Sequence, residues 1–261
     1  MPANAEMRSV AREGALLAGG ARAILLQIAH PAVGRGVAEH SDFAYRPLDR
    51  LRATLTYVYC TTFGTPEEIA AVAAQVTAAH RKVAGSGYRA SDPELQLWVA
   101  ATLYDTAILL YEELFGPLEA TVADKVYEQY AVLGTALQVP AELWPADRTA
   151  FRSYWDRMVE TLEVSDDARR VARDLLSAEN APLLLKAAMP LNRFLTAAWL
   201  PPRIRSEFGL DWDAGAQRRY DVLMKVGAPA YRLLPVPLRE APKTYYLREM
   251  RRKKIGGMRP A

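Results

Sequence analysis

The sequence contains little of what most metal, redox and nucleophilic sites require. Cys60 is the single cysteine of 261 residues, so no disulfide can form within the chain, and a reducing, cytoplasmic location is expected. Because Cys60 lies in an apolar helical run, we predict a small buried thiol. The three histidines are too few for a multi-histidine metal site, and no pair of Glu-x-x-His motifs indicates a di-iron centre.

Long uninterrupted apolar runs are also lacking. The apolar segments 15–29 and 181–200 are each broken by glycine, proline, lysine or arginine, so neither is expected to span a membrane. The first residues do not show the basic-then-apolar order of a secretory signal. Both observations favour a cytoplasmic protein.

The composition is that of an ordinary globular protein, with 51% apolar and 24% charged residues. One large domain over residues 1–246 is the simplest organisation at this length. The net charge of +3 comes from a basic C-terminal tail, residues 247–261, which we expect to be solvated. A weak contact of this tail with a membrane surface remains an alternative, and no nucleic-acid partner is expected.

Helix start and stop signals recur along the chain. Residues 65–68, Thr-Pro-Glu-Glu, form a capping box, and 91–94, Ser-Asp-Pro-Glu, give a similar start. The second start, together with the stop at Gly116, predicts a buried central helix ending at Phe115. Further helices are predicted at 6–29, 48–63, 118–137, 146–162, 166–178, 190–199 and 213–226. Residues 85–90 loosely match a dinucleotide-binding motif, but they follow a helix rather than a strand and are predicted to be a loop. We predict an all-α, single multi-helix domain.

Six segments in the first hundred residues carry a family resemblance. They read LQIAHPAVG (26–34), GVAEHSDF (36–43), PLDRLRATL (47–55), TFGT (62–65), HRKVAG (80–85) and DPELQLWV (92–99). In order and spacing they resemble the catalytic core of the MpaB-type oxygenases and the latex-clearing, or rubber, oxygenases. The resemblance implies a helical core, globin-like in the rubber oxygenases, around a b-type haem. It also implies an oxygenase that acts with dioxygen on a hydrophobic organic substrate.

The resemblance also implies which residues form the site. The family's Arg-x-x-x-Thr pattern falls on Arg50 and Thr54, and the acidic residue upstream falls on Glu39. The axial histidine falls best on His80, with His30 as the second choice. On a helix, Arg50 and Thr54 share one face, and an imidazole can hold iron while leaving its other side open to dioxygen. Glu39 could act as a base or proton relay if burial raised its pKa.

Each of these residues also has a purely structural interpretation. A histidine at a helix C-terminus, such as His80, favours the helix dipole without binding a metal. Glu39 and Arg50 could form a salt bridge, and Thr54 could bond to its own helix.

Two positions depart from the family pattern. Ala53 stands where rubber oxygenases carry a lysine, and Ala100 stands where many members carry a histidine. These departures keep a second reading open, a non-catalytic helical protein that binds haem or a lipophilic ligand. The oligomeric state is left open.

Overall fold

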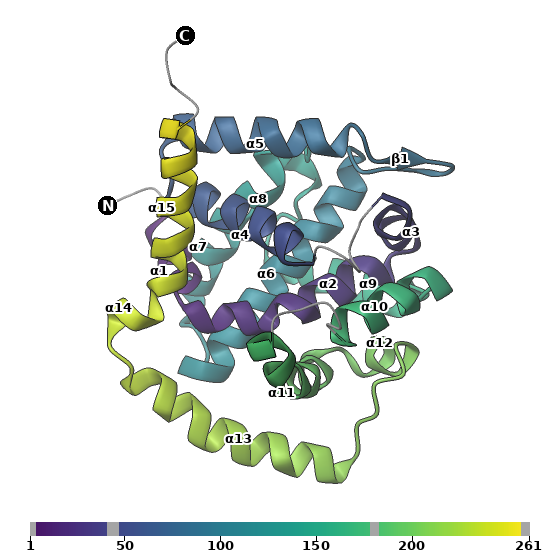
Figure 1. Cartoon of the computed structure of the whole chain (residues 1–261), viewed down its shortest axis with the longest axis vertical. Helices are drawn as coiled ribbons and strands as arrows, with labels where there is room; N and C mark the ends of the chain where they lie inside the picture. The colour runs from purple at the N-terminus through teal and green to yellow at the C-terminus, as the bar shows by residue number, and fades with distance from the viewer. Residues whose placement is uncertain (1–3, 41–46, 178–182, 257–261) are drawn as a thin grey trace.

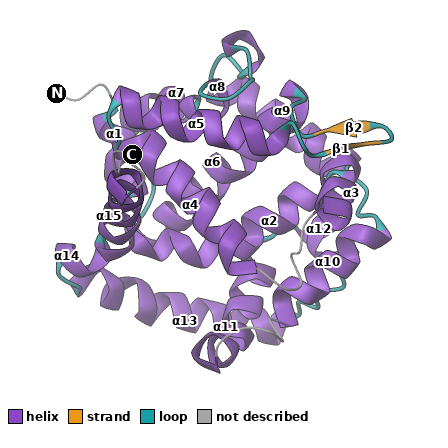
Figure 2. Cartoon of the chain, turned by 45° about the horizontal axis from the view of Figure 1, so that its top comes forward, coloured by secondary structure: helices purple, strands orange, loops and turns teal. Residues whose placement is uncertain are grey.

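The protein is almost wholly helical in the part that the structure describes (Figure 2). This computed structural model describes residues 4–40, 47–177 and 183–256, with the side chains of 47–51, 183–185 and 253–256 outside the description. The predicted all-α class is confirmed. Within these ranges the only strands are β1 (Ala84–Gly85) and β2 (Tyr88–Arg89), which pair antiparallel. The segment predicted as a loop is thus a small hairpin, because Gly87 adopts a φ of +82° and closes a two-residue turn.

The central helix α6 (Pro93–Phe115) follows its predicted signals. The Asp92 carboxylate accepts a hydrogen bond from the amide of Glu94 at 2.9 Å, and the helix ends at Gly116, whose φ is +87°. Helix α2 (Gly20–Ala29) packs against α6, and the indole of Trp98 donates to the carbonyl of Leu26 at 3.0 Å. Trp98 is fully buried, so the core is centred on this helix pair.

Other helices surround this pair (Figure 1). In the first half of the chain they are α1 (Ala5–Ala11), the 3₁₀ helix η1 (Gly14–Gly19), α3 (Pro31–His40), α4 (Pro47–Phe63) and α5 (Pro66–His80). In the second half they are α7 (Ala120–Tyr130), α8 (Val132–Thr135), η2 (Ala141–Leu143), α9 (Arg148–Thr161), α10 (Asp166–Ser177), α11 (Leu183–Trp199) and α12 (Pro202–Glu207). The capping box predicted at 65–68 is present at the start of α5.

The prediction of one helix over 6–29 was wrong. The segment is divided into α1, η1 and α2, and glycines stand at Gly14, Gly19 and Gly20, where these elements meet. A Cβ atom at Gly19 would lie 2.6 Å from the Thr106 side chain of α6, so only glycine allows this close packing. The break turns α2 onto the central helix.

The end of the chain wraps around the molecule (Figure 1). Helix α13 (Ala214–Leu233) packs on α6 and α11, the short α14 (Val236–Arg239) turns the chain, and α15 (Ala241–Gly256) returns along α4. The boundary expected between 246 and 247 falls inside α15. There Leu247 is buried, and the Arg251 guanidinium donates to both carboxylate oxygens of Glu68 at 2.9 and 3.1 Å.

In the described ranges no single helix has the length and hydropathy needed to cross a membrane. One bent pair, Gly14–Ala29 with Pro31–His40, meets the test only when both parts are taken together across a bend of 108°.

Candidate functional site

A cavity of about 350 Å³ lies among α2, α3, α4, α5, α6 and the hairpin. A smaller cavity of about 110 Å³ adjoins it, because both are lined by Gln27, Thr54, Leu103 and Leu133. Their walls are mostly apolar. Together they have the size and character of a site for an apolar ligand or a large cofactor, with a few polar groups to orient it.

His80 is one of these polar groups. It is the last residue of α5, half-buried, and lines the larger cavity. The amide nitrogen of Gln96 lies 3.4 Å from its Nδ1. The sequence predicted His80 as the cofactor ligand, and the structure places its ring at a cavity wall.

A glutamine pair supports this wall of the cavity. The Gln96 side-chain oxygen accepts from the backbone amide of Gln138 at 3.1 Å, which fixes the orientation of the Gln96 amide. Its nitrogen donates to the Ala90 carbonyl at 2.9 Å and to the Gln138 side-chain oxygen at 2.7 Å. The Gln138 nitrogen in turn donates to the Thr77 hydroxyl at 2.7 Å, on the same helix as His80. Because both Gln96 hydrogens go to shorter bonds, the contact with His80 is weak and does not fix its tautomer.

Helix α4 brings Thr54 to the site. Thr54 is half-buried and lines both cavities, and Ala53, at the position where rubber oxygenases carry a lysine, lines the larger one. Arg50 lies one turn earlier on the same helix, but its side chain is outside the described part of the structure. The expected shared face of Arg50 and Thr54 therefore stays a prediction.

Glu39 is linked to the cavity by a hydrogen bond with Tyr88. Its side chain is exposed and lies outside the set of described residues that line the cavity. The hydroxyl of Tyr88, which does line it, donates to the Glu39 carboxylate at 2.5 Å. This hydrogen bond and burial raise the pKa of Tyr88 to about 12, so the phenol keeps its proton at neutral pH. The burial on which a role of Glu39 as a base depended is not found, because its side chain is exposed.

His40 lines the cavity as well, and sequence reasoning missed it as a site residue. Its Nε2 lies 3.1 Å from the carbonyl of Ala84 in the hairpin, so Nε2 carries the proton and donates. A ring whose other nitrogen is fixed in this way is the usual arrangement for a metal-binding histidine. The partner is 44 residues away in the sequence, so no local pattern could reveal the contact.

His30, the second choice for the axial ligand, has a different setting. It lies outside the set of described cavity residues, between α2 and α3. Its Nδ1 accepts from the amide of Ala32 at 3.2 Å, so His30 caps the start of α3. Burial lowers the pKa of His30, which keeps the ring neutral and able to accept.

Two further predictions can be compared with the structure. Cys60 is fully buried, as expected for a small thiol in an apolar helix. Ala100 lines the larger cavity, so the position where many family members carry a histidine faces this site. Among the described residues, no group of three or more histidine, cysteine, aspartate or glutamate side chains could hold a bare metal ion.

The residues fit a haem group by their chemistry. A b-type haem is held by packing against apolar walls and by coordination to an axial ligand, for which an imidazole is suited. The cavity offers apolar walls with two imidazoles, His40 and His80, and the hydroxyl of Thr54 at its edge.

Comparison with known proteins defines the class. Residues 7–228 match the family described as "ER-bound oxygenase mpaB/B'/Rubber oxygenase, catalytic domain", which covers most of the chain. The chain belongs to this family, as the resemblance of its first hundred residues predicted.

Two similar curated relatives come from mycobacteria. They are the uncharacterized proteins Rv2237 of Mycobacterium tuberculosis and Mb2261 of Mycobacterium bovis. Each is 40% identical over 222 residues, which covers 81% of this chain and 87% of the relative. No solved structure matches the chain.

Proposed function

We propose that this protein is a haem-b-dependent oxygenase that acts with dioxygen on a hydrophobic organic substrate. The observation that carries the proposal is the apolar cavity, with His80 and Thr54 on its wall, in a chain that belongs to an oxygenase family. We also propose a cytoplasmic location, in keeping with the lone thiol of Cys60.

In this proposal His80 holds the haem, which supplies the redox chemistry with dioxygen when bound. The apolar walls bind the substrate and exclude water. Thr54 offers a hydroxyl to orient bound molecules, and Arg50, one turn before it, is proposed to add a cation. The Tyr88 hydroxyl holds a proton at the cavity wall, and Glu39, which accepts the hydrogen bond of that hydroxyl, is proposed as the outer partner of a proton relay.

An absorption spectrum tests the proposal directly. Protein purified from haem-replete cells is expected to show a Soret band that changes with carbon monoxide and dioxygen. His80→Ala should remove or strongly alter the band, whereas His30→Ala should leave it unchanged because His30 caps a helix. If only His40→Ala removes the band, the ligand is His40 and the assignment of His80 is wrong. Folded protein that contains no haem and does not bind added hemin would overturn the proposal.

One observation favours a second function, a non-catalytic binding protein for haem or a lipophile. Ala100 lines the cavity where many family members carry a histidine, and an alanine neither ligates iron nor transfers a proton. Such a protein would bind hemin, or an apolar dye in its place, without any spectral response to dioxygen. A response to dioxygen in the purified haem protein would exclude this alternative.

A further inference from the structure

An unusually exposed set of aliphatic side chains runs along α13 and into α14. On α13, Val222 and Val226 are 64% and 66% exposed and lie one turn apart, and Leu233 is 85% exposed on the same side two turns later. The stripe continues through the connection to α14. We call the following six residues the apolar ridge: Val222, Val226, Leu233, Leu234, Val236 and Leu238.

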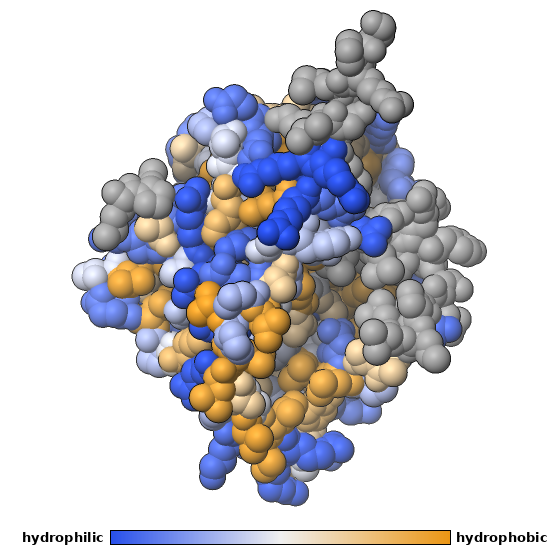
Figure 3. Space-filling model, turned by 60° about the vertical axis from the view of Figure 1, so that its left-hand side comes forward, coloured by the Kyte–Doolittle hydropathy of each residue, from blue (hydrophilic) through white to orange (hydrophobic). Residues whose placement is uncertain are grey.

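The ridge forms part of a continuous apolar surface. Figure 3 shows hydrophobic residues gathered in a band on this side of the molecule, with strongly hydrophilic residues around it. Single exposed leucines are ordinary on protein surfaces, but contiguous apolar patches with a polar rim mark interaction sites. All residues from 232 to 238 are exposed. We call residues 233–238, from the last residue of α13 into α14, the connection between the two helices.

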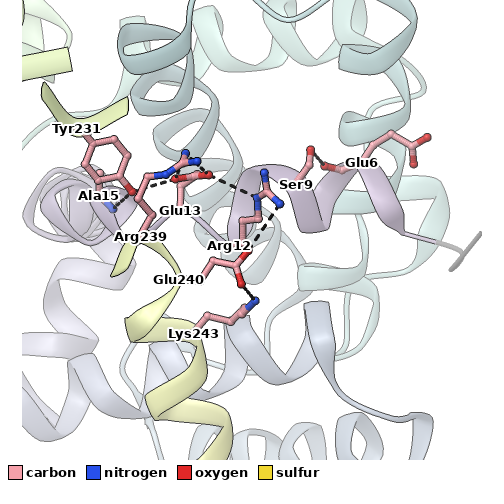
Figure 4. A network of polar contacts seen from close by, with 9 residues as sticks. All are labelled: Glu6, Ser9, Arg12, Glu13, Ala15, Tyr231, Arg239, Glu240 and Lys243. Carbon is pink, nitrogen blue, oxygen red and sulfur yellow. Dashed lines mark hydrogen bonds and ion pairs between the residues drawn. The ribbon is translucent and has the colours of Figure 1, made fainter. Parts of the chain in front are cut away.

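This connection is held outward from both ends by one buried carboxylate (Figure 4). Before it, the Tyr231 hydroxyl donates to Glu13 at 3.0 Å and accepts from the amide of Ala15 at 3.2 Å. After it, the Arg239 guanidinium donates to both oxygens of Glu13 at 3.0 and 3.1 Å. Glu13 is only 2% exposed. With its ends fixed, the connection does not fold its leucines inward, and little ordering entropy is lost when they bind.

The charge around the ridge is positive. The exposed side chains of α13 include Arg218, Arg219 and Lys225, and Arg232 immediately precedes the protruding connection. Asp221 is the one acidic residue in the sequence of this helix. A two-fold contact between copies of this face would bring these cations together, which disfavours a second copy as the partner.

A groove of about 590 Å³ opens beside the ridge, between α14 and α15. It is lined by Val236 of the ridge and by the exposed Arg248 and Arg252, together with Glu240 and Glu249. Glu240 is already paired with cations of this chain. The arginines therefore offer positive charge next to the apolar side chains.

We propose that the apolar ridge docks on the surface of a lipid bilayer that contains anionic lipid. Its aliphatic side chains enter the boundary between headgroups and acyl chains, while the flanking cations contact the headgroups. The inference stands apart from the proposed haem chemistry, because the ridge lies on α13 and α14, and no described residue of these two helices lines the cavities.

Co-sedimentation of the full chain with vesicles tests the inference. One set of vesicles consists of phosphatidylcholine, and the other contains an equal part of phosphatidylglycerol. The protein should sediment with the anionic vesicles. Leu233→Ser with Leu238→Ser should weaken binding by about tenfold or more, since each leucine loses its apolar contact. Lys225→Gln with Arg232→Gln should lower the preference for anionic vesicles by about tenfold. Leu191→Ser, at an exposed leucine of α11, is the matched control and should bind like the natural protein.

Three outcomes would overturn the inference. In the first, the folded protein sediments with neither kind of vesicle. In the second, the double leucine variant binds as well as the natural protein. In the third, ultracentrifugation would show a dimer that the double leucine variant disperses, in the absence of vesicle binding, and the partner would be a second copy. Circular dichroism of each variant checks that folding is retained, and haem content is measured separately.

Discussion

The three histidines of this chain differ in what their ring nitrogens contact. His30 accepts from a helix-start amide, His40 donates to a carbonyl of the hairpin, and His80 stands beside the Gln96 amide at the cavity wall. Their roles can therefore be separated by substitution. Substitution of a helix-capping histidine should lower the stability of the fold, whereas substitution of a haem ligand should change the absorption spectrum.

His30 provides the sharpest test at this scale. His30→Ala should lower the free energy of unfolding by about 1 kcal/mol, because the Ala32 amide loses its acceptor. His30→Asn should restore most of that loss, since asparagine can accept from the same amide. Urea denaturation at neutral pH measures both variants. A loss of haem in His30→Asn, with stability restored, would show that His30 is a ligand.

The contribution of His30 to folding stability should also depend on pH. Burial lowers the pKa of His30 in the folded state, so the unfolded chain binds a proton more readily. The stabilising effect of the neutral ring is complete above the unfolded pKa of about 6.5 and is lost as the pH falls below it. The natural protein should therefore lose more stability on mild acidification than His30→Asn does.

Among the elements, the C-terminal helices depend on the buried carboxylate of Glu13. It joins η1 to both sides of the turn between α13 and α14 through Tyr231 and Arg239. The two backbone segments also approach closely there, because a Cβ at Gly14 would lie 2.7 Å from the carbonyl oxygen of Arg239. Glu13 is thus the most buried of the residues that fix α14, and Arg12 adds a second contact through Glu240 at 3.6 Å.

Glu13→Ala should cost about 3–5 kcal/mol of unfolding free energy, because it leaves the mostly buried guanidinium of Arg239 without its carboxylate. Adding Arg239→Met should recover much of this loss by removing the uncompensated charge. The matched control, Glu240→Gln, affects a more exposed carboxylate and should cost less than about 1 kcal/mol. Urea denaturation measures all three. A Glu13→Ala cost no larger than that of the control would contradict this account.

For the whole molecule, the tyrosines set the response to alkali. Burial raises the pKa of many of them, including Tyr57, Tyr59 and Tyr130, and it raises the pKa of Tyr104 to about 12. The unfolded chain releases these protons near pH 10, whereas the folded chain keeps them. Stability should be complete below about pH 10 and fall as the pH rises above it, because the unfolded state then binds fewer protons.

Each such tyrosine should contribute a slope of about 1.4 kcal/mol per pH unit between its unfolded and folded pKa. Tyr104→Phe should therefore show a shallower fall than the natural protein. Tyr245→Phe, at an exposed position, is the control and should leave the slope unchanged. Urea denaturation at a series of alkaline pH values measures the slopes, and equal slopes in all three proteins would contradict the prediction.

The helical class, the capping box of α5, the bounds of the central helix and the family could all be predicted from the amino-acid sequence. These depend on local spacing and on residues such as Thr65, Asp92 and Gly116, whose effects act within one helical turn. It also selected His80 and Thr54, which both line the cavity. The break of the first predicted helix was missed, because it depends on how closely Gly19 packs on α6.

The remaining contacts could be found only in the folded molecule. The contact of His40 with Ala84 spans 44 residues, and that of Tyr88 with Glu39 spans 49. Glu13 meets Arg239 across 226 residues. Such pairs form when helices pack in three dimensions, and a local sequence pattern does not predict which distant side chain will be the neighbour. The apolar ridge is of the same kind, because only the packed fold shows which face of α13 remains uncovered.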